Sequence, residues 1–201
     1  MTRLTAIAVA VVIVAVVAVG AAVGYRWSCS RSGPTHDEFR VYSTVLDRLA
    51  ADRNLPRKLV AIERTTSKLE EHQVEKWVPA ELRPEKGQPP SNFVKFCGTL
   101  CGYDYVWKNQ QEWRLEPSAD VSFPFGVLRV SEPLQRTSSS GIVVRATRPG
   151  FDFWHHRAVL TYTFDCSVSG DVSVICVDFG TAYLEETNGV WGVVRHDDFT
   201  F

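Results

Sequence analysis

The sequence predicts an α+β domain that follows one N-terminal transmembrane helix. Residues 4–24 form an apolar run without a charged side chain, and helix-capping signals with regularly spaced apolar residues come after it. From residue 125 onward, β-branched and aromatic runs alternate with Gly, Ser, Pro and Asn. Helices first and consecutive strands afterwards are typical of α+β folds. We therefore expect two to three helices packed on one face of an antiparallel β-meander.

The length and charge of the chain are those of one ordinary domain. Without its first 25 or so residues the 201-residue chain keeps roughly 175, enough for a single core. Arg3 is the only charged side chain before Arg26, so the remainder carries 21 basic and 23 acidic side chains. Such a balanced surface lacks the basic field that holds a nucleic-acid backbone. We expect no nucleic-acid partner.

The apolar run has the length of a membrane span. At about 1.5 Å per residue it covers roughly 30 Å, the hydrocarbon thickness of a bilayer. A secretory signal has an apolar region of only about 7 to 15 residues, although small-residue cleavage sites such as Ala18-Val19-Gly20 leave processing open. Tyr25 and Trp27 fit an interfacial aromatic belt. We expect residues 1–25 to be an uncleaved anchor in the lipid bilayer, 26–34 a linker and 35–201 one domain.

Two signals disagree about the orientation of this anchor. Arg26, Arg31 and Arg40 follow the apolar run and only Arg3 precedes it, which favours a cytoplasmic domain by the positive-inside rule. The cysteine content and the position of the run at the N-terminus, as in a signal-anchor, favour the outside. We expect a single-pass protein of the cell membrane with an extracytoplasmic domain, and a cytoplasm-facing adaptor is the alternative.

The cysteines of the domain are candidates for disulfides. Cys166 and Cys176 bracket a turn-rich stretch, and closing about ten residues contributes roughly 2 to 3 kcal/mol in the chain-entropy model. Cys97 and Cys101 stand four residues apart, too far on an ideal helix, but the neighbouring glycines indicate a break there. Buried free thiols or a four-cysteine zinc site are the alternatives, and zinc is disfavoured because nine residues separate Cys166 from Cys176. Disulfides would imply an oxidising compartment, and Cys29 has no evident partner.

The first half of the domain contains the helix signals. Thr35 and Glu38 have the spacing of a capping box, and apolar residues at three- and four-residue steps continue the helix to about Asn54. Residues 58–65 are typical of a strand. A second capping box predicts a short helix from Ser67 to about Val78, a proline-rich loop follows, and a third helix is expected over 91–100.

The second half contains the strand signals. Asn188-Gly189 lies between two alternating runs, which is a strong hairpin signal. The expected strands are 126–132, 141–147, 155–166, 172–186 and 190–201.

The order of these C-terminal motifs resembles a loose group of uncharacterised bacterial envelope proteins. The resemblance is carried by Gly150-Phe151, the strand 158–162, the Cys166/Cys176 loop, Tyr183-Leu184-Glu185 and the Gly189-x-Trp191 turn. The chain departs from the group at Ala146, where a serine is expected, and in lacking a glycine-rich cysteine loop. The group implies an envelope location and no activity. The last hairpin is also similar to that of nuclear-transport-factor-2-like domains, which is an analogy of fold alone.

No catalytic, cofactor-binding or metal-binding motif stands out in the sequence. His155 and His156 would point to opposite faces of a strand and could not chelate one ion together. Tyr103, Tyr105 and Trp107, followed by polar residues, have the composition of a partner-facing loop. We expect a membrane-tethered envelope module that binds another envelope protein and has neither cofactor nor catalysis. The alternative is an envelope small-ligand binder or hydrolase with a pocket between helices and sheet.

Overall fold

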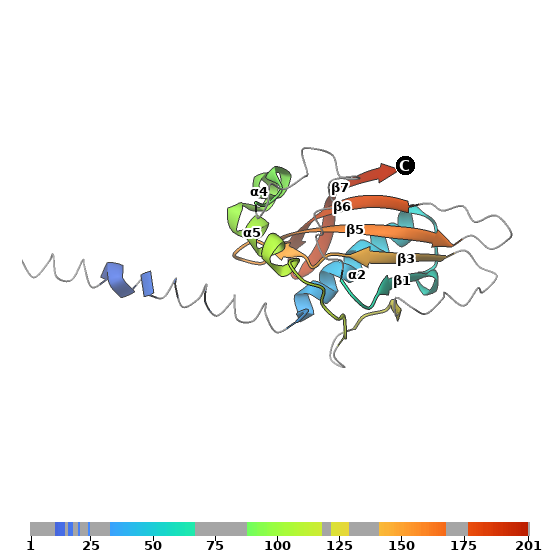
Figure 1. Ribbon diagram of the computed structural model, residues 1–201, viewed down its shortest axis with the longest axis horizontal. Coiled ribbons are helices and arrows are strands. Elements are labelled where there is room, and N and C mark those ends of the chain that lie inside the picture. Colours follow the sequence, from blue (N-terminus) through green and yellow to red (C-terminus); the bar gives the residue numbers. More distant parts are fainter. Residues whose placement is uncertain are drawn as a thin grey trace, which may run out of the picture. The chain divides into compact units, whose positions relative to one another are not determined.

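The computed structural model of the chain describes residues 33–66, 88–117, 122–128, 141–167 and 177–200, with a few helical residues between 11 and 24 (Figure 1). The chain consists of two compact units, Met1–Gly33 and Pro34–Phe201. Most of the expected membrane helix over 4–24 lies outside the described residues, so the anchor stays a prediction. Within the described ranges, no helix combines the length and apolar character that a bilayer crossing requires.

The helices of the second unit agree in part with those expected. Helix α2 (His36–Asp52) is the helix predicted from the first capping box, and a short 3₁₀ turn, η1 (Arg57–Leu59), follows it. The helix expected over 67–78 lies outside the described residues. The third expected helix is two helices, α4 (Ser91–Cys97) and α5 (Thr99–Lys108), which meet at Gly98. Gly98 has φ +87°, a left-handed conformation that glycine adopts without a steric penalty.

A seven-stranded mixed sheet forms the body of this unit. Its order is β2-β1-β3-β5-β6-β7, and β4 pairs with β5. The strands are β1 (Val60–Glu63), β2 (Gly126–Leu128), β3 (Gly141–Ala146), β4 (Gly150–Phe151), β5 (Arg157–Ser167), β6 (Val177–Thr187) and β7 (Val190–Thr200).

The prediction of an antiparallel meander is correct only for the strands from β3 to β7, at one end of the strand order. Strands β3, β5, β6 and β7 pair antiparallel, whereas β1 pairs parallel with both β2 and β3. More than 60 residues separate β1 from β2, and a connection of that length can cross the sheet and return in the same direction. Pure hydrophobic patterning does not distinguish the two directions.

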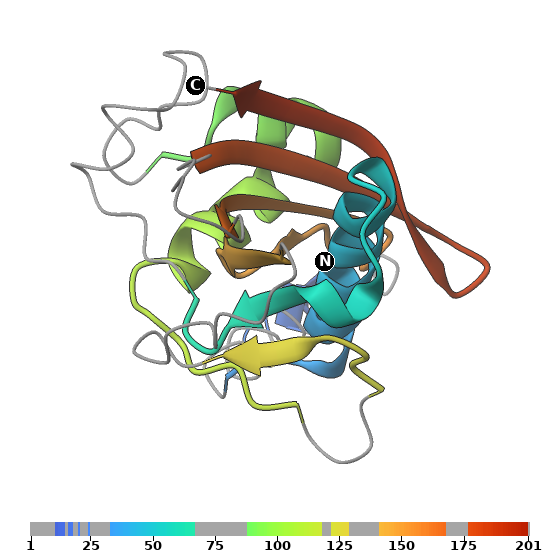
Figure 2. The same ribbon diagram turned by 90° about the vertical axis from the view of Figure 1, so that its right-hand side faces the viewer.

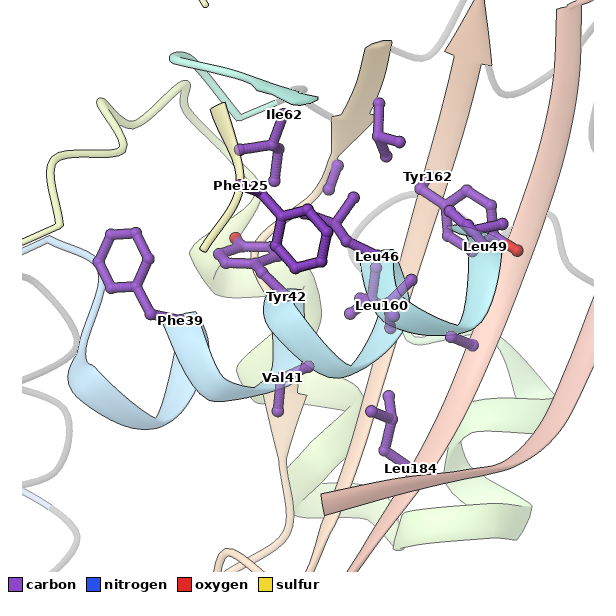
Figure 3. Packing of buried hydrophobic residues seen from close by; sticks show 14 of the residues in the cluster. Phe39, Val41, Tyr42, Leu46, Leu49, Ile62, Phe125, Leu160, Tyr162 and Leu184 are labelled. Atoms are coloured by element: carbon purple, nitrogen blue, oxygen red, sulfur yellow. The ribbon is translucent and has the colours of Figure 1, made fainter. Parts of the chain in front are cut away.

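Helices cover both faces of the sheet, so the prediction that they pack on one face is wrong (Figure 2). Alternate residues of one strand point to opposite faces. Leu160 and Tyr162 of β5 belong to the large core under α2, whereas Val159 belongs to a smaller core with Phe93 and Tyr105 of α4 and α5. Figure 3 shows the larger core, in which the apolar face of α2 lies against the sheet.

The hairpin predicted between the last two strands is confirmed. Asn188 and Gly189 have φ 52° and 79°, and Thr187 pairs with Val190 across them. A two-residue turn with positive φ at both central residues matches the right-handed twist of the strands. Arg40 of α2 donates a hydrogen bond to the carbonyl of Gly189, so the hairpin tip lies beside the first turn of α2.

Candidate functional site

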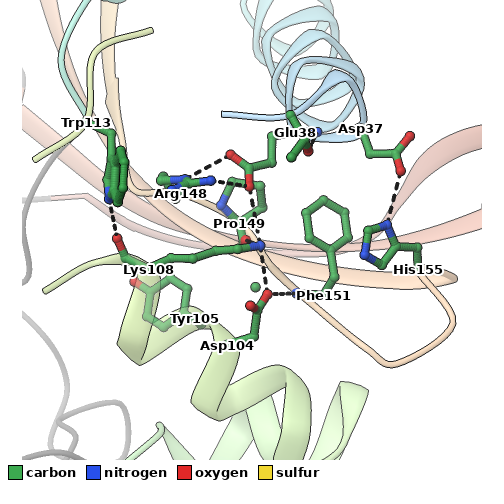
Figure 4. Close-up of polar contacts among 12 residues, drawn as sticks. Asp37, Glu38, Asp104, Tyr105, Lys108, Trp113, Arg148, Pro149, Phe151 and His155 are labelled. Carbon is green, nitrogen blue, oxygen red and sulfur yellow. Dashed lines mark hydrogen bonds and ion pairs between the residues drawn. The ribbon is translucent and has the colours of Figure 1, made fainter. Parts of the chain in front are cut away.

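The start of α2, helix α5 and the segment 147–151 meet around a buried group of charges (Figure 4). Arg148 donates from Nε and Nη2 to the two carboxylate oxygens of Glu38, at 3.0 and 2.8 Å. Neither side chain is exposed to solvent. A two-point contact between guanidinium and carboxylate is the strongest ion-pair geometry that side chains form. It joins the first turn of α2 to the segment that leads into β4.

A lysine and a second carboxylate balance the charge of this group. Lys108 Nζ lies 3.3 Å from Glu38 Oε1, 2.8 Å from Asp104 Oδ2 and 3.2 Å from the carbonyl of Pro149. Among the described residues, two cations therefore face two carboxylates. The Lys108 ammonium also lies 4.7 Å from the ring centre of Phe151. Buried charges are tolerated when they are paired and hydrogen-bonded in this way, so the group fixes α5 against α2.

Only one of the two contacts of the predicted capping box is present between Thr35 and Glu38. Thr35 Oγ1 accepts a hydrogen bond from the Glu38 amide at 3.4 Å, as a cap requires. The Glu38 side chain does not reach back to the Thr35 amide. It binds Arg148 because a buried guanidinium offers a stronger, charge-assisted contact than a backbone amide.

Asn109 holds the backbone of the same segment. Its Oδ1 accepts from the Arg148 amide at 2.7 Å, and its Nδ2 donates to the Arg148 and Tyr105 carbonyls, each at 2.8 Å. The indole of Trp113 donates to the Lys108 carbonyl at 2.9 Å and stacks under the Arg148 guanidinium. No local motif in the sequence marks Lys108, Asn109, Trp113 or Arg148 as members of this group.

Two buried tyrosines flank the charges. Tyr42 donates to the Thr147 carbonyl at 3.1 Å, and the Tyr105 hydroxyl lies 2.8 Å from Thr161 Oγ1. Burial raises the pKa of Tyr42 well above its usual value, and the Glu38 carboxylate raises it further. Burial also raises the pKa of Tyr105 to about 12. Both phenols are therefore neutral parts of the packing. Tyr105, which the sequence places in a partner-facing loop, is buried inside the domain.

The outer face of α5 carries the other two residues predicted to face a partner. Leu100 is 60% exposed and Tyr103 is 44% exposed, whereas Trp107 is half-buried. These residues stand at positions i, i+3 and i+7, which share one face of a helix. The buried residues Cys101, Tyr105 and Lys108 occupy the opposite face. We call Leu100, Tyr103 and Trp107 the α5 stripe.

The structure places a disulfide at the joint between α4 and α5. The sulfurs of Cys97 and Cys101 are bonded, and their Cα atoms are 5.7 Å apart. The chain leaves the helical path at Gly98, which is why two residues four apart can approach closely enough. The disulfide therefore fixes the start of the α5 stripe relative to α4.

The pairing of Cys166 with Cys176 stays a prediction. Cys166 belongs to β5, and Cys176 lies outside the described residues. Asp165 and Val177 form the last described pair of the β5–β6 ladder. Each of the two cysteines is next in sequence to one member of this pair.

His155 and His156 precede β5 in a tight turn and are not strand residues. His155 has φ 57° and stacks on Phe151, with ring centres 4.6 Å apart. Its Nδ1 lies 3.0 Å from Asp37 Oδ2. A carboxylate only accepts, so Nδ1 carries the hydrogen and Asp37 fixes the orientation of the ring. In the described part of the chain, no three His, Cys, Asp or Glu side chains gather in a metal-binding arrangement.

Comparison with known proteins yields no relative of this chain: no family model, no characterised protein and no solved structure matches it. The function must therefore be argued from the site itself.

Proposed function

We propose that the chain is a membrane-tethered interaction module of the cell envelope that binds a protein partner through the α5 stripe and has no catalysis of its own. The observation that carries this proposal is the exposure of Leu100 and Tyr103, at 60% and 44%, on one face of a rigidly held helix. Large apolar side chains at i and i+3 on an amphipathic helix are typical anchors of helix-in-groove recognition.

The rigidity of α5 supports this role. The disulfide holds its first turn, the buried charges hold Asp104 and Lys108, and Asn109 holds its last turn to the 147–151 segment. A helix that is already ordered loses little conformational freedom on binding, so more of the contact energy contributes to affinity. The inner face provides the support, and the exposed side chains of Leu100 and Tyr103 stand on the outer face.

The Cys97–Cys101 disulfide also supports an extracytoplasmic location for the domain, because disulfides persist in oxidising compartments. The membrane tether rests on the sequence of residues 4–24. A membrane-impermeant maleimide applied to intact cells tests both. Labelling of Cys29 before lysis supports the outside location, whereas labelling of Cys29 only after lysis would favour the cytoplasm-facing alternative.

Photo-crosslinking in living cells tests the partner surface. A photoreactive amino acid is placed at position 100 or 103 of the full chain, and at position 194 as the control. Val194 on β7 is also a large exposed apolar residue, at 54%. We expect the same protein adduct from positions 100 and 103 and none of that size from 194. The adduct from position 100 should disappear when Tyr103→Asp is added.

Two results would contradict the proposal. One is an absence of protein adducts from both stripe positions in cells where the chain is membrane-bound. The other is an identical adduct pattern from position 194, which would indicate unspecific proximity.

A further inference from the structure

A second exposed surface lies at the end of the domain where α2 begins. Trp154 is 72% exposed and Val190 is 69% exposed, the two most exposed large apolar side chains described in the second unit. Trp154 lies in the turn 152–157 between β4 and β5, which we call the Trp154 turn. Val190 follows the tip of the β6–β7 hairpin.

Hydrogen bonds place the Trp154 turn and the hairpin tip together. The Glu186 amide donates to the His156 carbonyl at 2.8 Å, which joins the hairpin close to its tip to the turn. The first turn of α2 contacts both, because Asp37 binds His155 and Arg40 binds the Gly189 carbonyl. Trp154 and Val190 therefore belong to one end of the domain, the end at which α2 starts.

The Trp154 turn is held in a single conformation. Asp152 Oδ1 accepts from the amides of His156 and Arg157, at 2.7 and 3.1 Å, and the Asp152 amide donates to the Arg157 carbonyl at 3.0 Å. His155 adopts a positive φ that is uncommon for a residue with a side chain. Its ring is clamped between Asp37 and Phe151. The turn thus holds the Trp154 ring rigidly and exposes it to solvent. Because the ring is not part of a core, packing inside the domain does not account for a tryptophan at this position.

The covalent path from the apolar run to this end of the domain is short. Residues 25–35 connect residue 24 to the first residue of α2, and eleven residues span at most about 40 Å. The start of α2 is therefore the part of the folded domain that is nearest in the chain to the apolar run. If residues 4–24 cross a bilayer, this end of the domain is the one that the tether keeps near the lipid surface.

The charges around the turn are mixed. Arg40 and Arg157 are accompanied by Asp37, Asp152 and Glu185, and Arg157 pairs with Glu185 at 2.9 Å. Such a surface has no excess of positive charge to attract anionic lipid. A tryptophan, by contrast, is favoured at the headgroup level of any bilayer because its ring is apolar and its N–H is polar.

We propose that the Trp154 turn rests in the headgroup region of the bilayer and that Trp154 and Val190 are its lipid contacts. The proposal rests on the membrane tether of the proposed function. Its consequence is a preferred orientation, in which this end of the domain lies on the membrane.

Quenching of tryptophan fluorescence by brominated lipid tests the proposal. The full chain is reconstituted into phosphatidylcholine vesicles with and without acyl chains brominated close to the headgroup, and the quenched fraction is compared with that of Trp154→Phe. The matched control adds Ala51→Trp to Trp154→Phe, which moves the indole to an exposed position in the last turn of α2. Residue 51 lies about 22 Å along the helix from its start, at about 1.5 Å per residue.

We expect the bromolipid to quench the wild-type chain more than Trp154→Phe, by about the share of one tryptophan among six. The Ala51→Trp control should not restore the quenching, and 0.5 M salt should not reduce it. Equal quenching of wild type and Trp154→Phe would overturn the proposal, and so would equal quenching from positions 154 and 51.

Vesicle flotation after carbonate washing separates this inference from the proposed function. A chain that is washed off the vesicles lacks the tether, and both proposals fail. A chain that floats but shows no quenching at position 154 keeps its tether and overturns only the lipid contact of the Trp154 turn.

Discussion

Arg148 and Glu38 form a two-point ion pair with both side chains wholly buried, across 110 positions of sequence. Burying two charges costs free energy, and breaking such a pair by removing one partner is far more destabilising than replacing both. The pair therefore acts less as a source of stability than as a constraint on which parts of the chain can meet. It requires the start of α2 to pack against the segment before β4.

Removing the charge of Glu38 should destabilise the domain severely. Glu38→Gln removes the carboxylate that contacts both Arg148 and Lys108 in the buried group, and we expect the free energy of unfolding to fall by about 3–5 kcal/mol. Urea unfolding of the full chain in detergent measures the change. Arg48→Gln, which removes the exposed contact with Asp52, should cost less than about 1 kcal/mol. Equal effects of the two substitutions would contradict the role assigned to the buried pair.

Replacing both partners should be milder than replacing one. In Glu38→Met with Arg148→Met, no unpaired charge of the pair remains and the volume is roughly kept, so part of the stability lost in Glu38→Gln should return. The comparison by urea unfolding is direct, because both variants lack the same carboxylate. A double variant less stable than Glu38→Gln would indicate that Arg148 packing on Trp113 dominates.

Gly150 should tolerate no side chain. A Cβ atom built there would lie 2.5 Å from Tyr105 Cβ and 2.7 Å from the Cys101 carbonyl oxygen, so α5 would have to move. We expect Gly150→Ala to lower the free energy of unfolding by about 1–3 kcal/mol, the usual cost of overpacking. Gly126→Ala is the control, since its Cβ would meet only Ala61 Cβ at 3.5 Å. Thermal unfolding of the two variants should separate them clearly.

Alkaline pH should unfold the domain through its buried tyrosines. Folding raises the pKa of Tyr105 from 10.0 to about 12 and that of Tyr42 in the same direction, so the folded state favours the neutral phenols. Their contribution to stability is complete below pH 10 and is lost as the pH rises from 10 towards 12. Absorbance of tyrosinate at 295 nm, followed with circular dichroism, should show both tyrosines ionising only with unfolding. Complete tyrosine ionisation in a folded domain would refute this.

Loss of the Cys97–Cys101 disulfide should weaken the α4–α5 joint without unfolding the domain. Closing a loop this short contributes about 2 kcal/mol in the chain-entropy model. In the reduced form each thiol keeps an acceptor, since Cys97 Sγ lies 3.2 Å from the Phe93 carbonyl and Cys101 Sγ lies 3.5 Å from that of Gly150. We expect a lower melting temperature with reductant and a retained circular dichroism spectrum. Two results together would show that no bond forms: a melting temperature that the reductant does not change, and alkylation of both Cys97 and Cys101 in the absence of reductant.

Local signals in the sequence predicted local structure well. Thr35 caps α2, Asn188-Gly189 makes the hairpin turn, and β1, β3 and β7 lie within the runs that their β-branched residues indicated, while β5 ends one residue beyond its run. Each of these features depends on residues close together in the chain, where steric preference and hydrogen bonding decide the outcome.

The features that were missed depend on contacts between distant residues. The parallel direction of β1 and the Glu38–Arg148 pair have no counterpart in any short stretch of sequence. Helix α5 was read as a partner-facing loop because Tyr103, Tyr105 and Trp107 suggested exposure. The spacing of Cys101, Tyr105 and Lys108 at four and three residues would have identified a helix with Tyr105 on its inner face.

The contact between α2 and β7 has a consequence for the order in which the domain assembles. The hairpins that build β5, β6 and β7 pair residues near in sequence, and such contacts form quickly. Helix α2 must wait, because its first turn contacts Gly189 in the last hairpin and its apolar face belongs to a core that includes Trp191. On a ribosome, α2 emerges roughly 150 residues before that hairpin, at about 5–20 residues per second. For several seconds the apolar face of α2 has no native partner. During that time we expect the nascent chain to bind a chaperone or the membrane surface through this face.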